Sequence, residues 1–101
     1  MNLVKQVMET LRSEVAQSAA KAKAAGKLNF EACPEFIIEV PKDKDHGDFA
    51  TNAAMTLTKQ AKMKPRDIAQ ILVDELDMAN GIVDHVEIAG PGFINFYLKP
   101  Q

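Results

Sequence analysis

The chain has 101 residues, of which 47% are hydrophobic and 26% are charged, a balance typical of one globular domain and not of a disordered segment. No apolar run approaches the roughly 20 residues that cross a bilayer, and the single cysteine excludes an internal disulfide, so the sequence favours a cytoplasmic protein without a membrane partner. A net charge of −2 argues against indiscriminate binding of nucleic acid, although residues 1–66 are net basic and could steer a partner to one side.

A long helix is predicted over residues 4–25. Its apolar side chains recur at three- and four-residue spacing, and its second half is rich in alanine, the strongest helix former. Gly26 follows as a natural stop, because glycine readily adopts the left-handed conformation that ends many helices. The stripe consists of Val4, Val7, Met8, Leu11, Val15 and Ser18.

A strand is predicted over residues 35–40, because aromatic and β-branched residues run up to a proline there. Alternation places Phe36, Ile38 and Val40 on one face of this strand. A charged loop follows over residues 42–47.

After this loop the sequence allows a short strand and predicts a helix. A short strand near residues 47–49 is compatible with the sequence but is not required by it. Over residues 50–61 the spacing is helical, with alanines and Leu57 on one side. Asp48 is expected to cap this helix, since its carboxylate can accept hydrogen bonds from the free amides of the first turn.

The last part of the chain predicts one more helix and a hairpin. Pro65 suits the first helical position, and the helix is expected to end at Asn80-Gly81. Its apolar stripe is Ile68, Ile71, Leu72 and Leu76. Strands are predicted over residues 83–89 and 93–98, joined by a Gly-Pro-Gly turn. On the first of them, Val86 and Ile88 oppose His85 and Glu87.

The elements fall into groups of helices and strands, which predicts an α+β fold. The simplest architecture is a two-layer sandwich of helices on a small antiparallel sheet. No internal repeat or linker divides the chain, so residues 1–101 are predicted to form a single domain.

The last strand carries the clearest candidate for binding. Alternation places Phe93, Asn95 and Tyr97 on the face opposite to the helices, where an exposed ring can stack on an unpaired base. An amide can both donate to and accept from a base edge. Equally, these side chains can pack against another domain or against their cross-strand neighbours. The residues left to face the helices are Ile94, Phe96 and Leu98.

A basic run precedes and opens the last helix. It consists of Lys59, Lys62, Lys64 and Arg66, with no acidic residue inside it. These side chains are candidate phosphate contacts. The sequence alone favours the simpler reading, in which they are the solvated ends of two helices.

Two further clusters are weaker candidates. An acidic group could hold a metal ion, but it lacks the spacing of a calcium loop, and a solvated loop is favoured. It consists of Asp43, Asp45, His46 and Asp48. Cys33 with His46 or His85 could form a nucleophilic pair, although nothing in the sequence brings them together, and a packed thiol is favoured. We therefore predict no catalytic residue and no metal site.

Three short segments are distinctive together. Residues 46–52 read HGDFATN, residues 86–96 read VEIAGPGFINF, and between them KPR opens a helix at residues 64–66. In this order and at this separation they resemble the N-terminal additional domain of arginyl-tRNA synthetases, and the resemblance runs from the first helix to Leu98.

The resemblance implies a two-layer α+β module that precedes a class I catalytic domain. It implies that the module binds tRNA(Arg) through its D-loop, at the outer corner of the tRNA, and that the catalytic domain of the same chain is its other partner. Phe93 and Asn95 match the positions with which the family reads an exposed D-loop base. Two pairs of residues are expected to be structural, as a turn and a cap: Gly47 with Asp48, and Gly90 with Gly92.

The resemblance also implies what this chain does not do alone. The family's two ATP-handling signatures are absent from the sequence. ATP and arginine are therefore expected to bind a catalytic domain outside residues 1–101, and no cofactor is expected here. The longer parent would be an ATP-dependent arginine–tRNA ligase. The alternative to tRNA binding is a structural module that docks on the synthetase body or on another protein.

Overall fold

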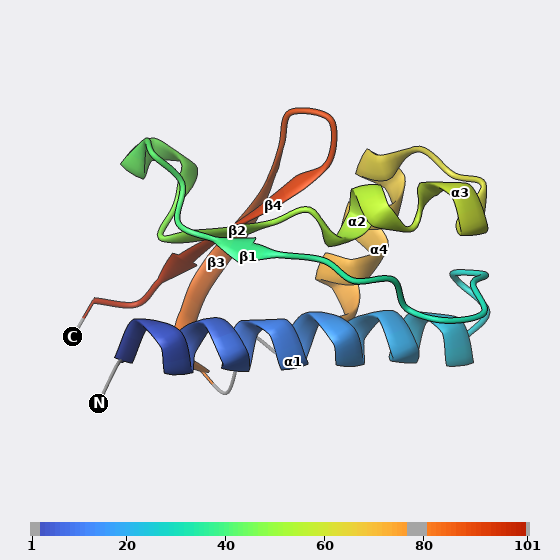
Figure 1. The fold of residues 1–101 in the computed structure, drawn as a ribbon, viewed down its shortest axis with the longest axis horizontal. Coiled ribbons are helices and arrows are strands. Elements are labelled where there is room, and N and C mark those ends of the chain that lie inside the picture. The colour runs from blue at the N-terminus through green and yellow to red at the C-terminus, as the bar shows by residue number, and fades with distance from the viewer. Residues whose placement is uncertain (1–2, 77–80, 101) are drawn as a thin grey trace.

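The computed structural model describes residues 3–76 and 81–100, in which one long helix runs beneath a sheet and the shorter helices lie beside that sheet (Figure 1). The helices are α1 (Leu3–Ala24), α2 (Ala53–Thr56), α3 (Thr58–Ala61) and α4 (Pro65–Glu75), with a short 3₁₀ helix, η1, at Lys44–His46. The strands are β1 (Ile38–Glu39), β2 (Phe49–Thr51), β3 (Val83–Ala89) and β4 (Phe93–Leu98). The predicted α+β class is confirmed. None of the described helices combines the length and the apolar character that a membrane crossing requires.

The described strands form an antiparallel sheet in the order β1-β2-β4-β3, so that β4, the last strand of the chain, lies in the interior of the sheet. It pairs with β2 on one side and with β3 on the other. Every residue of β4 therefore has cross-strand neighbours that help to decide its exposure.

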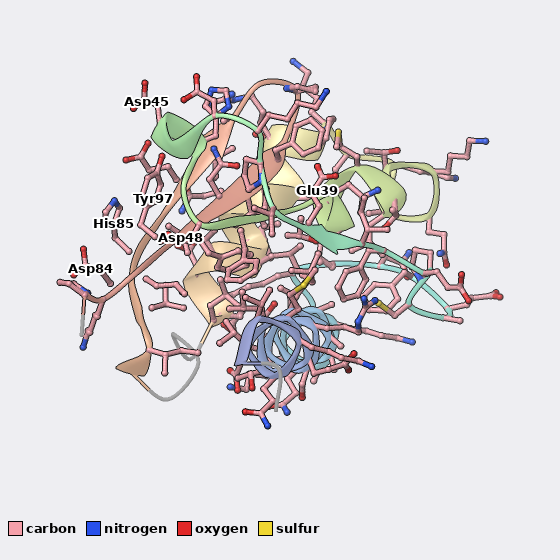
Figure 2. The ribbon with its side chains drawn as sticks, turned by 60° about the vertical axis from the view of Figure 1, so that its left-hand side comes forward. Glu39, Asp45, Asp48, Asp84, His85 and Tyr97 are labelled. Carbon is pink, nitrogen blue, oxygen red and sulfur yellow. The ribbon has the colours of Figure 1, made fainter. Side chains whose placement is uncertain are left out.

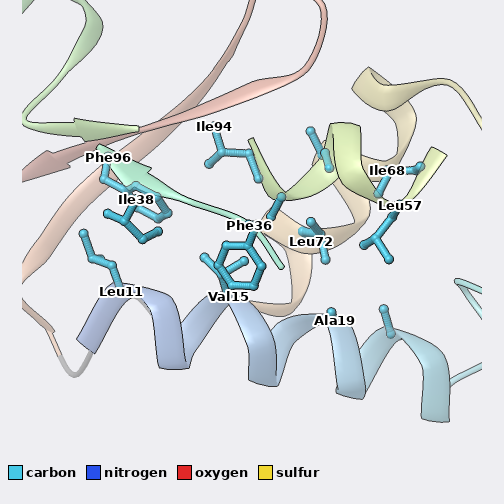
Figure 3. Close-up of a cluster of buried hydrophobic side chains, with 14 of the residues drawn as sticks. Leu11, Val15, Ala19, Phe36, Ile38, Leu57, Ile68, Leu72, Ile94 and Phe96 are labelled. Atoms are coloured by element: carbon cyan, nitrogen blue, oxygen red, sulfur yellow. The ribbon is translucent and has the colours of Figure 1, made fainter. Parts of the chain in front are cut away.

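The core lies between α1 and the sheet (Figure 3). Leu11 and Val15 of α1 are almost fully buried, as are Ile94 and Phe96 of β4. The cluster also includes side chains from β1, α2 and α4, among them Ile38, Ala53, Ala54, Ile68 and Leu72. Burying a side chain of this size contributes about 1.5–3 kcal/mol, so this cluster holds the two layers together.

Helix α1 confirms the first predicted helix. Its end is a left-handed turn, in which Gly26 has φ +78° and the amide of Lys27 donates to the carbonyl of Ala22 at 2.8 Å. This geometry satisfies carbonyls that the last helical turn leaves free. At the other end of the stripe Val4 is 52% exposed, because it lies at the rim of the molecule.

The segment around β2 corrects the sequence analysis. The expected helix over residues 50–61 does not begin at Ala50: β2 is a strand, and only the short α2 and α3 follow it, separated at Leu57. Pairing with β4 gives the backbone partners that a helix would otherwise supply, and Phe49 enters the core. Tertiary contacts thus outweigh the helix propensity of the alanines.

Asp48 does not cap a helix. Its carboxylate accepts a hydrogen bond from the amide of Leu98 at 2.9 Å, and its own amide donates to the carbonyl of Phe96 at 2.8 Å. Thr51 takes this role at the start of α2 instead. Its hydroxyl oxygen accepts a hydrogen bond from the amide of Ala53, the first residue of the helix, at 3.2 Å. The cap moves because the helix begins later than the sequence predicts.

Two further boundaries differ. Strand β1 is shorter than the predicted 35–40, and Val40 is 62% exposed instead of sharing the buried face of Phe36 and Ile38. Helix α4 begins at Pro65 as predicted but ends at Glu75, before the expected Asn80-Gly81, and Asn80 lies outside the described residues.

The hairpin of β3 and β4 is confirmed at its predicted bounds. Val86 and Ile88 pack against the core while His85 and Glu87 are exposed, as alternation predicts. A register shift between Val83 and His85 breaks this alternation at the start of β3 and brings Val83 into the core. Such bulges re-aim one side chain without ending the strand.

Candidate nucleic-acid interface

The outward face of β4 lines a hollow of about 410 Å³, to which Phe93 and Asn95 both contribute. Phe93 is partly exposed, whereas Asn95 is only 4% exposed and forms part of the floor. Ile94, between them, is fully buried on the helix side. The structure therefore places the two predicted base-binding residues together and away from the helices, with the amide recessed below the ring.

The hollow exists because one cross-strand neighbour of each of these two residues is an alanine. Asn95 pairs with Ala50 of β2, and Phe93 pairs with Ala89 of β3. Directly opposed side chains lie about 4.5–5.5 Å apart at Cβ, so a larger residue at either alanine would occupy the space above the floor. The volume lies within the range of about 300–1,000 Å³ that is usual for small-molecule sites.

A carboxylate stands at each end of the row that contains Asn95. Glu39 of β1 pairs with Ala50, Ala50 with Asn95, and Asn95 with Glu87 of β3. Glu39 lines the hollow itself. Carboxylates repel phosphate but accept hydrogen bonds from amino groups, so the floor suits the edge of a base.

The walls of the hollow come from two loops. The loop between β1 and β2 contributes Pro41, Lys42 and His46, and the turn between β3 and β4 contributes Gly90 and Pro91. Sequence reasoning missed Glu39 and Lys42 at this site, and considered His46 only as a metal ligand or as half of a nucleophilic pair. The signal that leads to them is the pairing of β1 with β2, which requires the short strand β2 to be recognised first.

Tyr97, the third outward residue of β4, is already engaged (Figure 2). Its ring stacks on that of His85, with centroids 4.4 Å apart and planes 5° from parallel, and its hydroxyl donates to the carbonyl of Asp45 at 2.6 Å. Desolvation first, and then the nearby carboxylate of Glu87, raise the pKa of Tyr97 above its ordinary value. Tyr97 thus fastens η1 to the sheet.

Three glycines, from residues 46–52 and 86–96 of the distinctive segments, allow the close backbone contacts that frame the hollow. Gly47 has φ +92°, and a Cβ there would lie 2.7 Å from the carbonyl oxygen of Phe96. Gly92 has φ +146°, and a Cβ there would lie 2.7 Å from Cβ of Pro65. Each position needs glycine for both its backbone angle and the close approach. Gly90 has φ +55° and its carbonyl accepts from Arg66 Nη1 at 2.6 Å.

The basic run is divided by the fold. Arg66 binds the β3–β4 turn beside the hollow, and Lys64 is exposed immediately before α4. Lys59 and Lys62 line a different hollow, together with the chain around Phe30. The four cations therefore do not surround Phe93 and Asn95 as one patch.

The weaker candidate clusters do not assemble. The carboxylate of Asp43 accepts from the amide of Asp45 at 2.9 Å within the loop, and Asp48 is bound to β4. Across residues 3–76 and 81–100, no three acidic, histidine or cysteine side chains meet in a group that could hold a metal ion. Cys33 is exposed at another hollow, which Arg12 also lines, so the packed thiol favoured by the sequence is wrong. Desolvation raises the pKa of this thiol, which disfavours the reactive thiolate.

Comparison with known proteins gives one consistent family. A family model described as "Arginyl tRNA synthetase N terminal domain" matches residues 5–98. Proteins named arginine–tRNA ligase are similar over nearly the whole chain: 53% identical over 99 residues in Desulforamulus reducens, 49% over 101 in Desulfitobacterium hafniense, and 52% over 101 in Staphylococcus aureus. The chain spans 98–100% of its own length in these matches but only 17–18% of the length of these relatives.

Proposed function

The chain belongs to the family of arginyl-tRNA synthetase N-terminal domains, and on this basis we propose that it binds the D-loop at the elbow of tRNA(Arg) and helps to position that tRNA for aminoacylation. In this proposal the domain acts in the cytoplasm ahead of a class I catalytic domain of the same chain. That catalytic domain would bind ATP and arginine and carry out the ligase reaction.

The observation that carries the proposal is the shared position of Phe93 and Asn95 on one hollow of the sheet face opposite to α1. The partly exposed ring offers a surface on which an unpaired base can stack, and the recessed amide can then donate to and accept from its edge. Because the amide is nearly buried, a base that cannot pair with it leaves polar groups unsatisfied, which favours one base over others.

The surrounding charges fit this assignment. Glu39, which lines the same hollow as Asn95, disfavours a phosphate on the floor. Arg66 beside the β3–β4 turn adds positive charge at the rim. The other cations of the basic run, Lys59, Lys62 and Lys64, are our candidates for phosphate contacts over the rest of the tRNA footprint.

The test is tRNA kinetics of the full-length ligase that carries this domain. Losing one base–aromatic stack costs about 1–3 kcal/mol, so Phe93→Ala should lower kcat/KM for tRNA about 5- to 150-fold. Asn95→Ala should lower it as well, and KM for ATP and arginine should not change. Ile37→Ala is the matched control, because Ile37 is an apolar side chain, 49% exposed, at a different hollow.

Unchanged tRNA kinetics in both Phe93→Ala and Asn95→Ala would overturn the proposal. The alternative, a module that docks on the synthetase body, predicts a different pattern. In that case the NMR signals of Phe93 and Asn95 would shift on addition of the catalytic body and not on addition of tRNA.

A further inference from the structure

The loop between β1 and β2 places two nitrogen-bearing side chains beside the hollow of Phe93 and Asn95. Lys42 and His46 both line this hollow, and both are exposed. Within the described part of the chain, no hydrogen bond or ion pair engages either side chain. Both are therefore available to a ligand in the hollow.

This loop is held in place by the sheet beneath it. Asp45, which precedes His46, accepts the hydroxyl of Tyr97 through its carbonyl at 2.6 Å (Figure 2). The amide of His46 donates to the carbonyl of Asp43 at 3.0 Å, which closes the η1 turn. After the turn, Gly47 lies against the carbonyl of Phe96, at an approach that only glycine allows. The backbone of the loop next to His46 is thus held against β4 before a ligand arrives, and Lys42 lies earlier in the same loop.

The hollow is consequently polarised. Glu39 lies in the same cross-strand row as Asn95, so negative charge marks the floor, whereas the wall made by the loop carries the cation of Lys42 and the imidazole of His46. A nucleotide complements this arrangement, because its base edge carries hydrogen-bond donors for the floor and its phosphate is an anion that suits the wall. Lys59 and Lys62, the residues that the sequence suggested for phosphate, lie at another hollow.

We propose that Lys42 and His46 bind the backbone phosphate of the nucleotide whose base stacks on Phe93, and that Tyr97 is the positioning residue that fastens the loop that carries them. This inference rests on the proposed function, since it requires an unpaired nucleotide in the hollow. It assigns the wall of the hollow to the phosphate and the floor to the base, so that one loop determines how the nucleotide is oriented.

The experiment measures the Kd of the full-length ligase for tRNA(Arg) as a function of salt concentration. Each neutralised phosphate contributes about 0.7–0.9 to the slope of log Kd against log salt. Lys42→Ala should therefore lower the slope by nearly one and weaken binding several-fold at low salt. His46→Ala should weaken binding in the same direction. Lys21→Ala is the control, because Lys21 is an exposed lysine of α1.

Tyr97→Phe tests the positioning role. This variant keeps a ring that can stack on His85 but removes the hydroxyl that donates to Asp45. Tyr97→Phe should reproduce part of the slope change of Lys42→Ala. The double variant Lys42→Ala/Tyr97→Phe should have the same slope as Lys42→Ala alone. A role in folding alone would lower thermal stability without altering the slope.

The outcomes separate the two proposals. If Phe93→Ala weakens tRNA binding while Lys42→Ala and Tyr97→Phe leave the slope unchanged, the phosphate assignment is wrong and base binding stands. If Lys59→Ala lowers the slope and Lys42→Ala does not, the backbone follows the other hollow and the assignment is again wrong. If neither Phe93→Ala nor Asn95→Ala has an effect, both proposals fail.

Discussion

Gly47 offers the sharpest test of the frame around the hollow, through the substitution Gly47→Ala. Gly47 has φ +92°, and an added Cβ would lie 2.7 Å from the carbonyl oxygen of Phe96. That oxygen also accepts the hydrogen bond from the amide of Asp48 at 2.8 Å. The methyl group therefore cannot be accommodated without moving a backbone group of β4 or the loop that carries η1.

The expected cost has two parts. A left-handed conformation costs a residue with a Cβ about 1–2 kcal/mol. Forcing an additional carbon into a filled site typically costs about 1–3 kcal/mol more. Together these give about 2–5 kcal/mol, a large share of the roughly 5–15 kcal/mol by which domains of this kind are stable.

Gly81→Ala is a matched control, because it separates the two parts. Gly81 also has φ +92°, but no atom of the described residues lies within 4 Å of its Cβ position. Only the conformational cost of about 1–2 kcal/mol applies there. Thermal and urea unfolding of the two variants should differ by about 1–3 kcal/mol, and each kcal/mol moves Tm by about 4–8 °C in a domain of this size. Equal losses of stability in the two variants would refute the argument from close approach.

Three further predictions concern single interactions. Thr51→Val should cost about 2–3 kcal/mol in urea unfolding, because Thr51 is fully buried and its hydroxyl serves two backbone groups, whereas Thr51→Ser should cost less. Asp48→Ala should cost about 1 kcal/mol through the lost acceptor for the amide of Leu98, and Asp48→Asn should keep most of that stability. Tyr97 is the sole tyrosine and the chain has no tryptophan, so tyrosinate absorbance reports this residue alone. Desolvation, then Glu87, raise its pKa in the folded state, so stability is full below about pH 10 and falls as pH rises through the folded-state pKa. A native titration midpoint at or below the midpoint in urea would contradict this.

The hairpin and α1 could be predicted from sequence because their signals are local. A Gly-Pro-Gly turn separates two runs of alternating residues, and β3 and β4 have the predicted bounds. In α1 the apolar spacing and the alanines agree with each other. In both elements, neighbours in sequence supply the decisive contacts.

Strand β2 follows from the same rules only as an option, because they allow a short strand near residues 47–49 but do not require it. It has three residues, Phe49–Thr51, and two alanines follow closely, so the local pattern favours a helix. The strand forms because β4, far along the chain, offers a partner on which Ala50 pairs with Asn95. The helix cap at Asp48 was wrong for the same reason, since β4 also takes up the carboxylate.

The same limit applies to the candidate site. Alternation alone indicates that Phe93 and Asn95 share a face, but it does not indicate how deep either lies. Depth depends on the cross-strand neighbours, and one of these, Ala50, belongs to β2 although local signals assign it to a helix. The contributions of Glu39 and Lys42 depend on that strand too, because the loop that carries Lys42 connects β1 to β2.

The three outward side chains of β4 differ in exposure and contacts because their cross-strand neighbours differ. Phe93 faces Ala89, which leaves its ring open to a ligand, and Asn95 lies between an alanine and a glutamate, which leaves it recessed but reachable. Tyr97 faces His85, whose ring covers it, and its hydroxyl holds the loop above. A shift of the register by one residue would turn all three toward the helices and expose the core side chains of the strand. The packing that makes the fold stable therefore also fixes which side chains the hollow presents, and an intact core is a condition for any binding there.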